Sequence, residues 1–265
     1  MAVKFDTKYG ITWCPGCPNY TILDSIKLAL VNLTKKGYKK ESFAMTTGIG
    51  CHGKIFDYID ISGIYGLHGR ALPTATGMKL ANPKLNVIVF EGDGDVYSEG
   101  LGHFVSIGKI NPNITLFVHD NQSFSLTTGQ ATPTSQEGYK SKAEPLGKFG
   151  PPLNPLELAL ASNVTFVARA NARDLKHTAM IMEKAIKHKG FAFVEIMQDC
   201  IVFNLDVNLK DKGMYKLDNK KRTKEQAMKI AKQYDYNSRK GKIPLGILYE
   251  EKRETLEESY SKIRK

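Results

Sequence analysis

Short apolar runs alternate with stretches of helical spacing along most of the chain. The runs "SFAMTT", "NVIVFE", "ITLFVHDN", "SNVTFVARA" and "GFAFVEIM" are predicted to be buried strands, because they are short and rich in β-branched and aromatic residues. Helices are predicted in "NYTILDSIKLALVNL", with Asn19 as the N-cap, in "LPTATGMKLANP", ending at Pro83, and in "SEGLGHFVSIGKI" and "ARDLKHTAMIMEKAIKHK".

This alternation predicts an α/β fold with a mostly parallel sheet and helices on both of its faces. In such sheets ligands bind at the carboxyl ends of the strands. Two polar motifs, "GIGC" and "GDGD", directly follow predicted strands, and a third, "DN", lies at the end of one. We therefore expect these motifs to meet at one edge of the sheet.

Two segments break the pattern. Residues 122–155 have many turn residues and little periodicity, and a loop of this length in a compact domain is usually functional or mobile. Beyond Asn204 the chain is polar, with one helix predicted around "TKEQAMKIAKQY". We therefore expect a main domain over residues 1–205 and a basic C-terminal extension over residues 206–265.

Composition agrees with one large α/β domain, since the chain has 265 residues, of which 42% are hydrophobic. The formal net charge is +11, and residues 206–265 hold 17 Lys and Arg against 10 Asp and Glu. This excess is either a solvated, lysine-rich surface or a means of steering an acidic partner. The basic residues are spread out and no nucleic-acid-binding motif accompanies them, which argues against a nucleic-acid partner.

The cellular setting follows from two absences. The start "MAVKFDTKYG" lacks the apolar segment of a signal peptide, and the apolar runs are too short to span a membrane. We therefore expect a cytoplasmic protein without a membrane partner. The four cysteines should then be reduced, and more often metal ligands or catalysts than disulfides.

The motif "EGDGDVYSEG" places Asp93 between two glycines at a predicted strand end, and Asn121 follows the next predicted strand. Mg²⁺ prefers hard oxygen ligands and commonly bridges to phosphates. The pair therefore favours a site for a magnesium-bound phosphate group. The alternative is that both are ordinary turn residues that cap strands.

The motif "GIGCHG" fits G-x-G-x-x-G after a strand, which is a weak signal for dinucleotide binding. A Rossmann site needs a full helix next. Here Gly63, Gly66 and Gly69 interrupt the following segment, so nicotinamide binding is not favoured.

The four thiols lie in three segments: Cys14 and Cys17 in "WCPGC", Cys51 in the glycine loop, and Cys200 after a predicted strand. Four convergent cysteines fit either zinc or an iron–sulfur cluster, and the spacing does not choose between them. "CPGC" alone also permits a thioredoxin-like dithiol, which needs neither of the other two cysteines.

Taken together, these motifs resemble the β subunit of the 2-oxoacid:ferredoxin oxidoreductases over roughly residues 10–205. The shared motifs are "WCPGC", "GIGC", "HGRALPTATGMKLANP", "GDGD", a Gly–x–His–Phe segment, "DN" before "LTTGQATPTS", and a late cysteine followed by "VFN". The resemblance implies thiamine diphosphate, Mg²⁺ and one [4Fe–4S] cluster as cofactors. It implies oxidative decarboxylation of a 2-oxoacid with coenzyme A, ferredoxin as electron acceptor, and an α subunit as partner, with γ and δ subunits as further candidates.

Carried over residue by residue, the resemblance implies the following sites. The cluster ligands are Cys14, Cys17, Cys51 and Cys200, and the Mg²⁺ ligands are Asp93, Asn121 and the backbone carbonyl of Ser123. Thiamine diphosphate lies against Ile49, Gly50, Cys51, His52, His68, Gly94, Asp95, Ser125 and Leu126. His52 and His68 handle protons or bind phosphate, unless they are ordinary loop histidines, and Lys54 lies near the substrate carboxylate.

The chain departs from the family at Pro18, where a glycine is common, at Phe124 and Ser125 before "LT", and at Thr128. Leu126 favours a 2-oxoglutarate or broad-specificity enzyme over a pyruvate-specific one. Two other interpretations stay open. One is a non-redox thiamine diphosphate decarboxylase with a structural zinc, and the other is a zinc-stabilised binding protein that keeps the fold without the activity. The family places the glutamate that activates the cofactor on the α subunit, so the chain should be inactive alone.

Overall fold

The structure is a computed structural model that describes residues 3–205 and 213–263. Its strands are β1 (Phe43–Thr47), β2 (Ser62–Tyr65), β3 (Asn86–Gly92), β4 (Ile114–Asp120), β5 (Phe166–Asn171), β6 (Ala192–Met197), β7 (Met214–Lys216), β8 (Tyr234–Asp235), β9 (Lys240–Gly241) and β10 (Ile243–Glu250). Its α-helices are α1 (Asn19–Lys35), α2 (Ala71–Ala81), α3 (Leu101–Ile110), α4 (Pro155–Ala161), α5 (Leu175–Lys187), α6 (Lys224–Ala231) and α7 (Leu256–Ile263). Shorter helical turns cover Lys40–Ser42, His52–Tyr58 and Asp95–Glu99, the last of them a π-helical turn.

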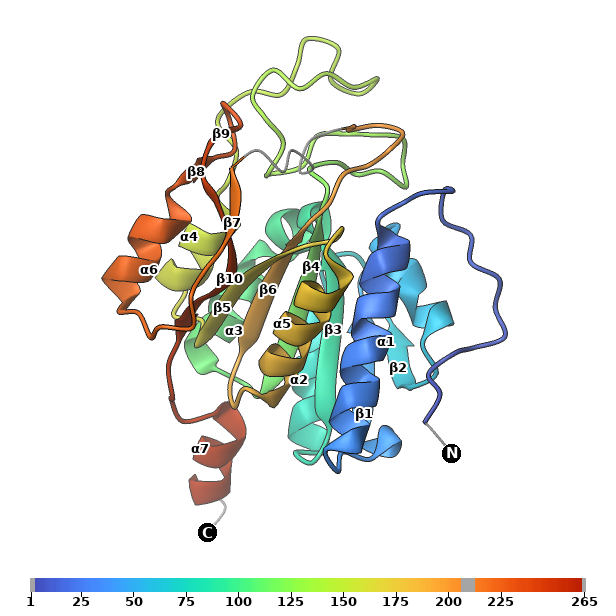
Figure 1. The fold of residues 1–265 in the computed structure, drawn as a ribbon, viewed down its shortest axis with the longest axis vertical. Helices are drawn as coiled ribbons and strands as arrows, with labels where there is room; N and C mark the ends of the chain where they lie inside the picture. Colours follow the sequence, from blue (N-terminus) through green and yellow to red (C-terminus); the bar gives the residue numbers. More distant parts are fainter. Residues whose placement is uncertain (1–2, 206–212, 264–265) are drawn as a thin grey trace.

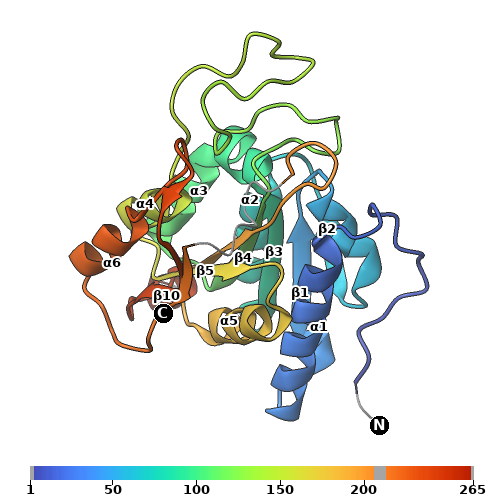
Figure 2. The same ribbon diagram turned by 45° about the horizontal axis from the view of Figure 1, so that its top comes forward.

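The main sheet has eight strands in the order β2-β1-β3-β4-β6-β5-β10-β7. The first six in that order are parallel to one another, whereas β10 runs antiparallel to β5. This confirms the predicted mostly parallel sheet. The carboxyl ends of the parallel strands lie at one edge, next to the loop over residues 122–154 (Figures 1 and 2).

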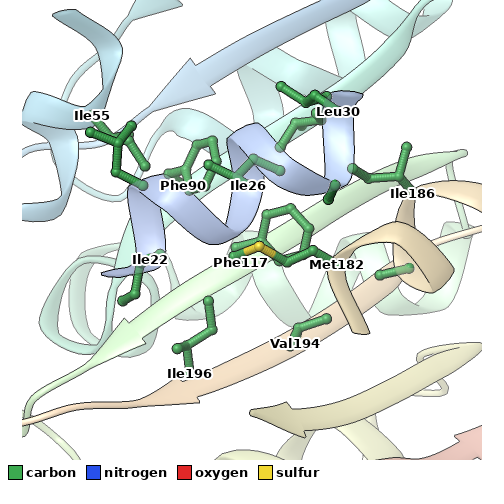
Figure 3. Packing of buried hydrophobic residues seen from close by; sticks show 14 of the residues in the cluster. Ile22, Ile26, Leu30, Ile55, Phe90, Phe117, Met182, Ile186, Val194 and Ile196 are labelled. Carbon is green, nitrogen blue, oxygen red and sulfur yellow. The ribbon is translucent and has the colours of Figure 1, made fainter. Parts of the chain in front are cut away.

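Helices cover both faces of the sheet, as predicted. On one face, α1 and α5 bury their apolar sides against alternate residues of β3, β4 and β6 (Figure 3). On the other face, α2, α3, α4 and α6 pack against the intervening residues. Both faces of the sheet are therefore buried, which explains why the sequences of the central strands are continuously apolar.

The predicted strands and helices of the first 205 residues are all present, with one local correction. Asn19 is not the N-cap of α1, because Pro18 occupies that position and has no side-chain oxygen with which to cap the helix. Asn19 is instead the first helical residue, and its buried side chain accepts a hydrogen bond from His119 Nδ1 (2.8 Å). Helix α4, at the end of the long loop, was not predicted.

The C-terminal part adds to the main sheet. β10 pairs with β5 and β7 pairs with β10, while the predicted helix in this part is α6. The division of the chain after residue 205 stays a prediction, but β7 and β10 share a sheet with the strands before it. In the described residues, no helix is both long and apolar enough to cross a membrane.

Candidate functional site

A cavity opens at the carboxyl ends of β1, β3 and β4, where the three polar motifs meet. Its empty space is about 480 Å³. It is lined by Ile49, Gly50, Cys51, His52, His68, Gly92, Asp93, Gly94, Asp95, His119, Asn121, Ser123, Phe124, Ser125, Leu126, Thr127 and Gln198. The sequence-based expectation that "GIGC", "GDGD" and "DN" converge is therefore correct.

The three expected magnesium ligands all lie on this cavity. Asp93 is 2% exposed, Ser123 is 4% exposed and Asn121 is 9% exposed. Asn121 Oδ1 accepts a hydrogen bond from the backbone N–H of Ser123 (3.1 Å), which shapes the turn after β4. Asn204 fixes that turn from behind by donating to the backbone carbonyls of Asn121 and Gln122 (3.1 Å each).

The charge of Asp93 is controlled by its surroundings. Burial raises the pKa of Asp93 to about 6, and hydrogen bonds from Thr132 and Thr134 partly oppose this rise. Thr134 Oγ1 donates to Asp93 Oδ2 (2.8 Å) and also lies 3.1 Å from Asp120 Oδ1. A divalent cation would favour the ionised form of Asp93.

A buried polar network continues beneath this site. Arg169 and Glu195, on neighbouring strands β5 and β6, form an ion pair (Nε to Oε2, 2.6 Å) with neither side chain exposed. Tyr236, which follows β8, donates to Glu195 and accepts from Arg169 Nη2 (2.7 Å). Burial raises the pKa of Asp120 well above its usual value, and the charges of Asp93 and Glu195 raise it further. The sequence analysis did not identify this network, because its members come from distant segments.

Asp95 joins two histidines at the cavity wall. Its Oδ2 lies 2.9 Å from His52 Nε2, and its Oδ1 lies 2.6 Å from His68 Nδ1. Burial raises the pKa of Asp95, but the hydrogen bonds with both histidines outweigh burial and hold the pKa at about 2. The same hydrogen bond raises the pKa of His68. Asp95 therefore stays ionised, which orients both rings and favours a protonated His68.

Glycines let these side chains approach the backbone. A Cβ on Gly48 would lie 1.6 Å from Asp95 Oδ2, and a Cβ on Gly92 would lie 2.7 Å from His52 Nδ1. Gly50 has φ +147, in the region that favours glycine, and also faces the His52 ring. The glycines of "GIGC" and "GDGD" thus make room for the His52–Asp95 pair.

The four cysteines come near one another at the same edge of the sheet. The Cys17 backbone N–H donates to the Cys14 carbonyl (3.0 Å), and the Trp13 indole donates to the Cys51 carbonyl (2.6 Å). The pKa of Cys17 is raised to about 11, first by burial, with further contributions from Cys51, Cys200 and Cys14. Cys17 is therefore within electrostatic reach of the other three thiols.

The structure tests whether these residues suit the expected cofactors. Among the described residues, no three His, Cys, Asp or Glu side chains are grouped closely enough to hold a metal ion, so the four-thiol cage stays a prediction. The oxygen donors beside the cavity do suit a magnesium-bound diphosphate, since they combine a carboxylate, an amide and backbone carbonyls. Their burial also suits close contact with a phosphate group.

All nine residues expected to contact thiamine diphosphate line the cavity, whereas Lys54 does not. Lys54 lies within the helical turn His52–Tyr58. Burial raises the pKa of the Cys51 thiol, and the charge of Lys54 opposes part of that rise. The expected contact of Lys54 with a substrate carboxylate stays a prediction.

His119 lies at the end of β4 and is 1% exposed, although no motif predicted it as a residue of the site. Burial lowers the pKa of His119 well below its usual value, so the ring is neutral. Its Nε2 has no hydrogen-bond partner among the described residues. The available signal was its place directly before "DN", which an otherwise apolar strand obscured.

Comparison with known proteins agrees with this geometry. The model of the thiamine pyrophosphate enzyme C-terminal TPP-binding domain matches residues 48–196. The β subunit of a 2-oxoacid:ferredoxin oxidoreductase from Saccharolobus solfataricus is 43% identical, covering 90% of this chain and 81% of the relative. The β subunit of the second such enzyme of Aeropyrum pernix is 40% identical, covering 98% and 87%.

A solved structure is similar over almost the whole chain. It is a 2-oxoglutarate:ferredoxin oxidoreductase from Magnetococcus marinus with 2-oxoglutarate, coenzyme A and succinyl-CoA bound. The TM-score is 0.91 at 34% sequence identity, and the match covers 98% of this chain and 88% of that one.

Proposed function

The chain belongs to the β subunits of the 2-oxoacid:ferredoxin oxidoreductases, and from this premise we propose its part in the reaction. The subunit holds the diphosphate end of thiamine diphosphate through Mg²⁺, and its four cysteines hold one [4Fe–4S] cluster. With an α subunit, the enzyme converts a 2-oxoacid and coenzyme A to an acyl-CoA and CO₂ and passes the electrons to ferredoxin.

The observation that carries the proposal is the convergence of Asp93, Asn121 and Ser123 on one cavity. The carboxylate, the amide oxygen and the Ser123 carbonyl would be the protein ligands of Mg²⁺, whose remaining positions suit diphosphate oxygens. Thiamine diphosphate, when bound, supplies the electron sink that decarboxylation requires.

The residues beside the ligands bind and orient. His68 has a raised pKa and 34% of its side chain exposed, so it can carry a positive charge to a phosphate or hold a proton at Nε2. His52 is held by Asp95 and packed on glycines, which fixes its ring. Loop 122–154 borders the cavity through Phe124, Ser125 and Leu126 and would restrict the entry of water.

The choice of metal at the thiols rests on the oxidative chemistry. Electrons must leave the cofactor one at a time to reach ferredoxin, and Cys51 lies on the cofactor cavity itself. A cluster bound there would be well placed to accept them, whereas structural zinc has no redox chemistry. Four free cysteines also suit a cytoplasmic setting, in which thiols stay reduced.

The substrate is proposed to be 2-oxoglutarate or a range of 2-oxoacids. Leu126 lines the cavity and is 45% exposed, so it offers an apolar contact where a substrate side chain would lie. The similar solved structure contains 2-oxoglutarate, which supports the same choice.

An α subunit is proposed to complete the cavity. Loop 122–154 exposes Leu146 (82%) and Phe149 (85%), and the segment after edge strand β2 exposes Leu67 (74%). Exposed apolar side chains on one side of a cofactor site are typical of a protein interface.

The proposal is tested by removing one oxygen ligand. Asp93→Ala should abolish Mg²⁺-dependent binding of thiamine diphosphate in the assembled enzyme, measured by calorimetry, because the diphosphate charge is then poorly compensated. Asp60→Ala is the control, since Asp60 is an exposed carboxylate away from the cavity. Unchanged cofactor affinity in folded Asp93→Ala protein would contradict the site.

A further inference from the structure

The Cys14–Cys17 loop leaves two thiols accessible at the surface. Cys14 is exposed and Cys17 is half-buried. Cys17 lines a shallow groove together with Pro18, Tyr20 and Arg173, where the segment after β5 meets the start of α1. The groove therefore gives an outside molecule a direct approach to the thiols that are proposed to hold the cluster.

A second groove adjoins this one, since Arg173 lines both. The second is bordered by Asp174 and Lys176 before and within α5, and by Lys216 at the end of β7. We call the two together the thiol-side groove.

Positive charge dominates the thiol-side groove. It is bordered by three cationic side chains, Arg173, Lys176 and Lys216, and by one carboxylate, Asp174. Arg173 is 55% exposed, and its distance to the Asp199 carboxylate is 3.9 Å, too long for a hydrogen bond. The Lys216–Asp174 pair (2.7 Å) is solvent-exposed on the lysine side, and such a pair contributes little.

A second basic surface lies at the other end of α5. There Lys184 and Lys187 border a hollow together with Lys220, Lys221 and Arg222. Helix α5 has 13 residues, so its two ends are about 20 Å apart. The net charge of the chain does not decide which of these two surfaces an electron acceptor would contact. The rate of electron transfer falls steeply with distance, which favours the surface beside the thiols.

We propose that the thiol-side groove is the docking surface for an acidic ferredoxin. This inference rests on the proposed function, since it names where that reaction's electron acceptor binds. Oxidation of one 2-oxoacid anion with one coenzyme A thiol yields one acyl-CoA, one CO₂, one proton and two electrons. Two one-electron ferredoxins are therefore reduced in turn at this surface for each turnover.

The chemistry of the groove fits such a partner. Carboxylates on ferredoxin would meet the three cationic side chains, while Tyr20, Met214 and Tyr215 offer apolar contact among them. Exposed charges at the rim of an interface act mainly on the association rate and on its salt dependence. The attraction should be strong at low salt and screened when the Debye length falls to about 3 Å at 1 M.

The test compares two charge reversals on opposite ends of α5 in the assembled enzyme, Arg173→Glu and Lys187→Glu. Both change the net charge equally, and neither residue lines the cofactor cavity. Binding of an oxidised, acidic ferredoxin is measured by interferometry at several salt concentrations. Its reduction is assayed as kcat/KM, with methyl viologen as a small acceptor that needs no docking surface.

Arg173→Glu should weaken ferredoxin binding about 3- to 10-fold at low salt and flatten its salt dependence, with viologen reduction retained. Lys187→Glu should leave ferredoxin binding close to the wild-type value. Equal effects of the two reversals would overturn the docking surface and leave only non-specific attraction. Loss of subunit assembly in Arg173→Glu would also overturn it, because the groove would then be a subunit interface.

The binding measurement separates this inference from the proposed function. Wild-type enzyme that binds ferredoxin in the groove but reduces no acceptor with any 2-oxoacid would contradict the function and support the docking surface. Enzyme that reduces viologen normally, and whose ferredoxin affinity is unaffected by Arg173→Glu, would support the function and contradict the docking surface.

Discussion

At the scale of single residues, the site depends on side chains that hydrogen bonds and ion pairs hold in place. Asp95 holds His52 and His68 through its two carboxylate oxygens and also accepts from the backbone N–H of Gly69. A side chain at position 48 would clash with the Asp95 carboxylate, so only glycine fits there. An ionised, fully oriented carboxylate can fix two rings at once, which a single neutral hydrogen bond would do less firmly.

The thiols give a prediction at the same scale. Cys200→Ser in the assembled enzyme should lose visible colour, iron and acid-labile sulfide, because a hydroxyl is a poor substitute for a thiolate ligand. Iron and sulfide analysis measures the result, and thiamine diphosphate binding, which needs no cluster ligand from Cys200, is the internal control. Full iron and sulfide content in this variant would contradict the assignment of Cys200 as a cluster ligand. Wild-type protein that holds zinc in place of iron would favour the structural-zinc alternative.

At the scale of elements, the C-terminal strands support the sheet beneath the site. β10 covers the outer edge of β5, and Tyr236, between β8 and β9, contacts the buried Arg169–Glu195 pair. Asp120 is electrostatically linked to Glu195 on one side and to Asp93 on the other. The C-terminal segment is therefore connected, through polar groups, to the edge that carries the proposed magnesium site.

Removing the Tyr236 hydroxyl should destabilise the fold. Tyr236→Phe leaves buried polar atoms of Arg169 and Glu195 without that partner, at a cost of about 1–3 kcal/mol in the free energy of unfolding. Urea denaturation measures this value. Tyr234→Phe is the matched control, since Tyr234 packs edge-on against Tyr236 (5.0 Å between centroids) and lies outside the ion pair. Equal losses in both variants would show that the hydroxyl of Tyr236 contributes nothing specific.

At the scale of the whole molecule, the chain is proposed to provide one half of a cofactor site. The described residues form one main sheet and one small hairpin, and the matched family model is a single C-terminal TPP-binding domain. In the proposed function, the oxygen donors of the cavity hold the diphosphate end of the cofactor through Mg²⁺. Loop 122–154, whose first residues line the cavity, also exposes Leu146 and Phe149 to solvent.

The isolated chain is therefore expected to reduce neither ferredoxin nor viologen with any 2-oxoacid and coenzyme A, because the glutamate that activates the cofactor would come from the α subunit. Addition of the cognate α subunit should restore activity. Iron content and folding of the isolated chain serve as controls, so that inactivity is not confused with damage. Turnover by homogeneous isolated chain would refute the half-site interpretation.

Sequence by itself was sufficient for the sheet, the helices on its faces and the meeting of three loops at one edge. Buried strands must be continuously apolar, and parallel strands place their carboxyl ends together, so these features follow from local pattern and topology. Motifs such as "GDGD" also predicted oxygen ligands, and the structure places these residues on the cavity, although their binding of Mg²⁺ stays a prediction.

Tertiary structure alone decided how distant side chains pair. Asn19 contacts His119 across 100 residues, and Tyr236 contacts Glu195 across 41, although neither pair has a local sequence signal. The same holds for Arg173, which lies beside Cys17 only because β5 ends next to the start of α1. Local patterns report which face of an element is buried, whereas the partner of a buried polar or charged group depends on which elements the fold brings together.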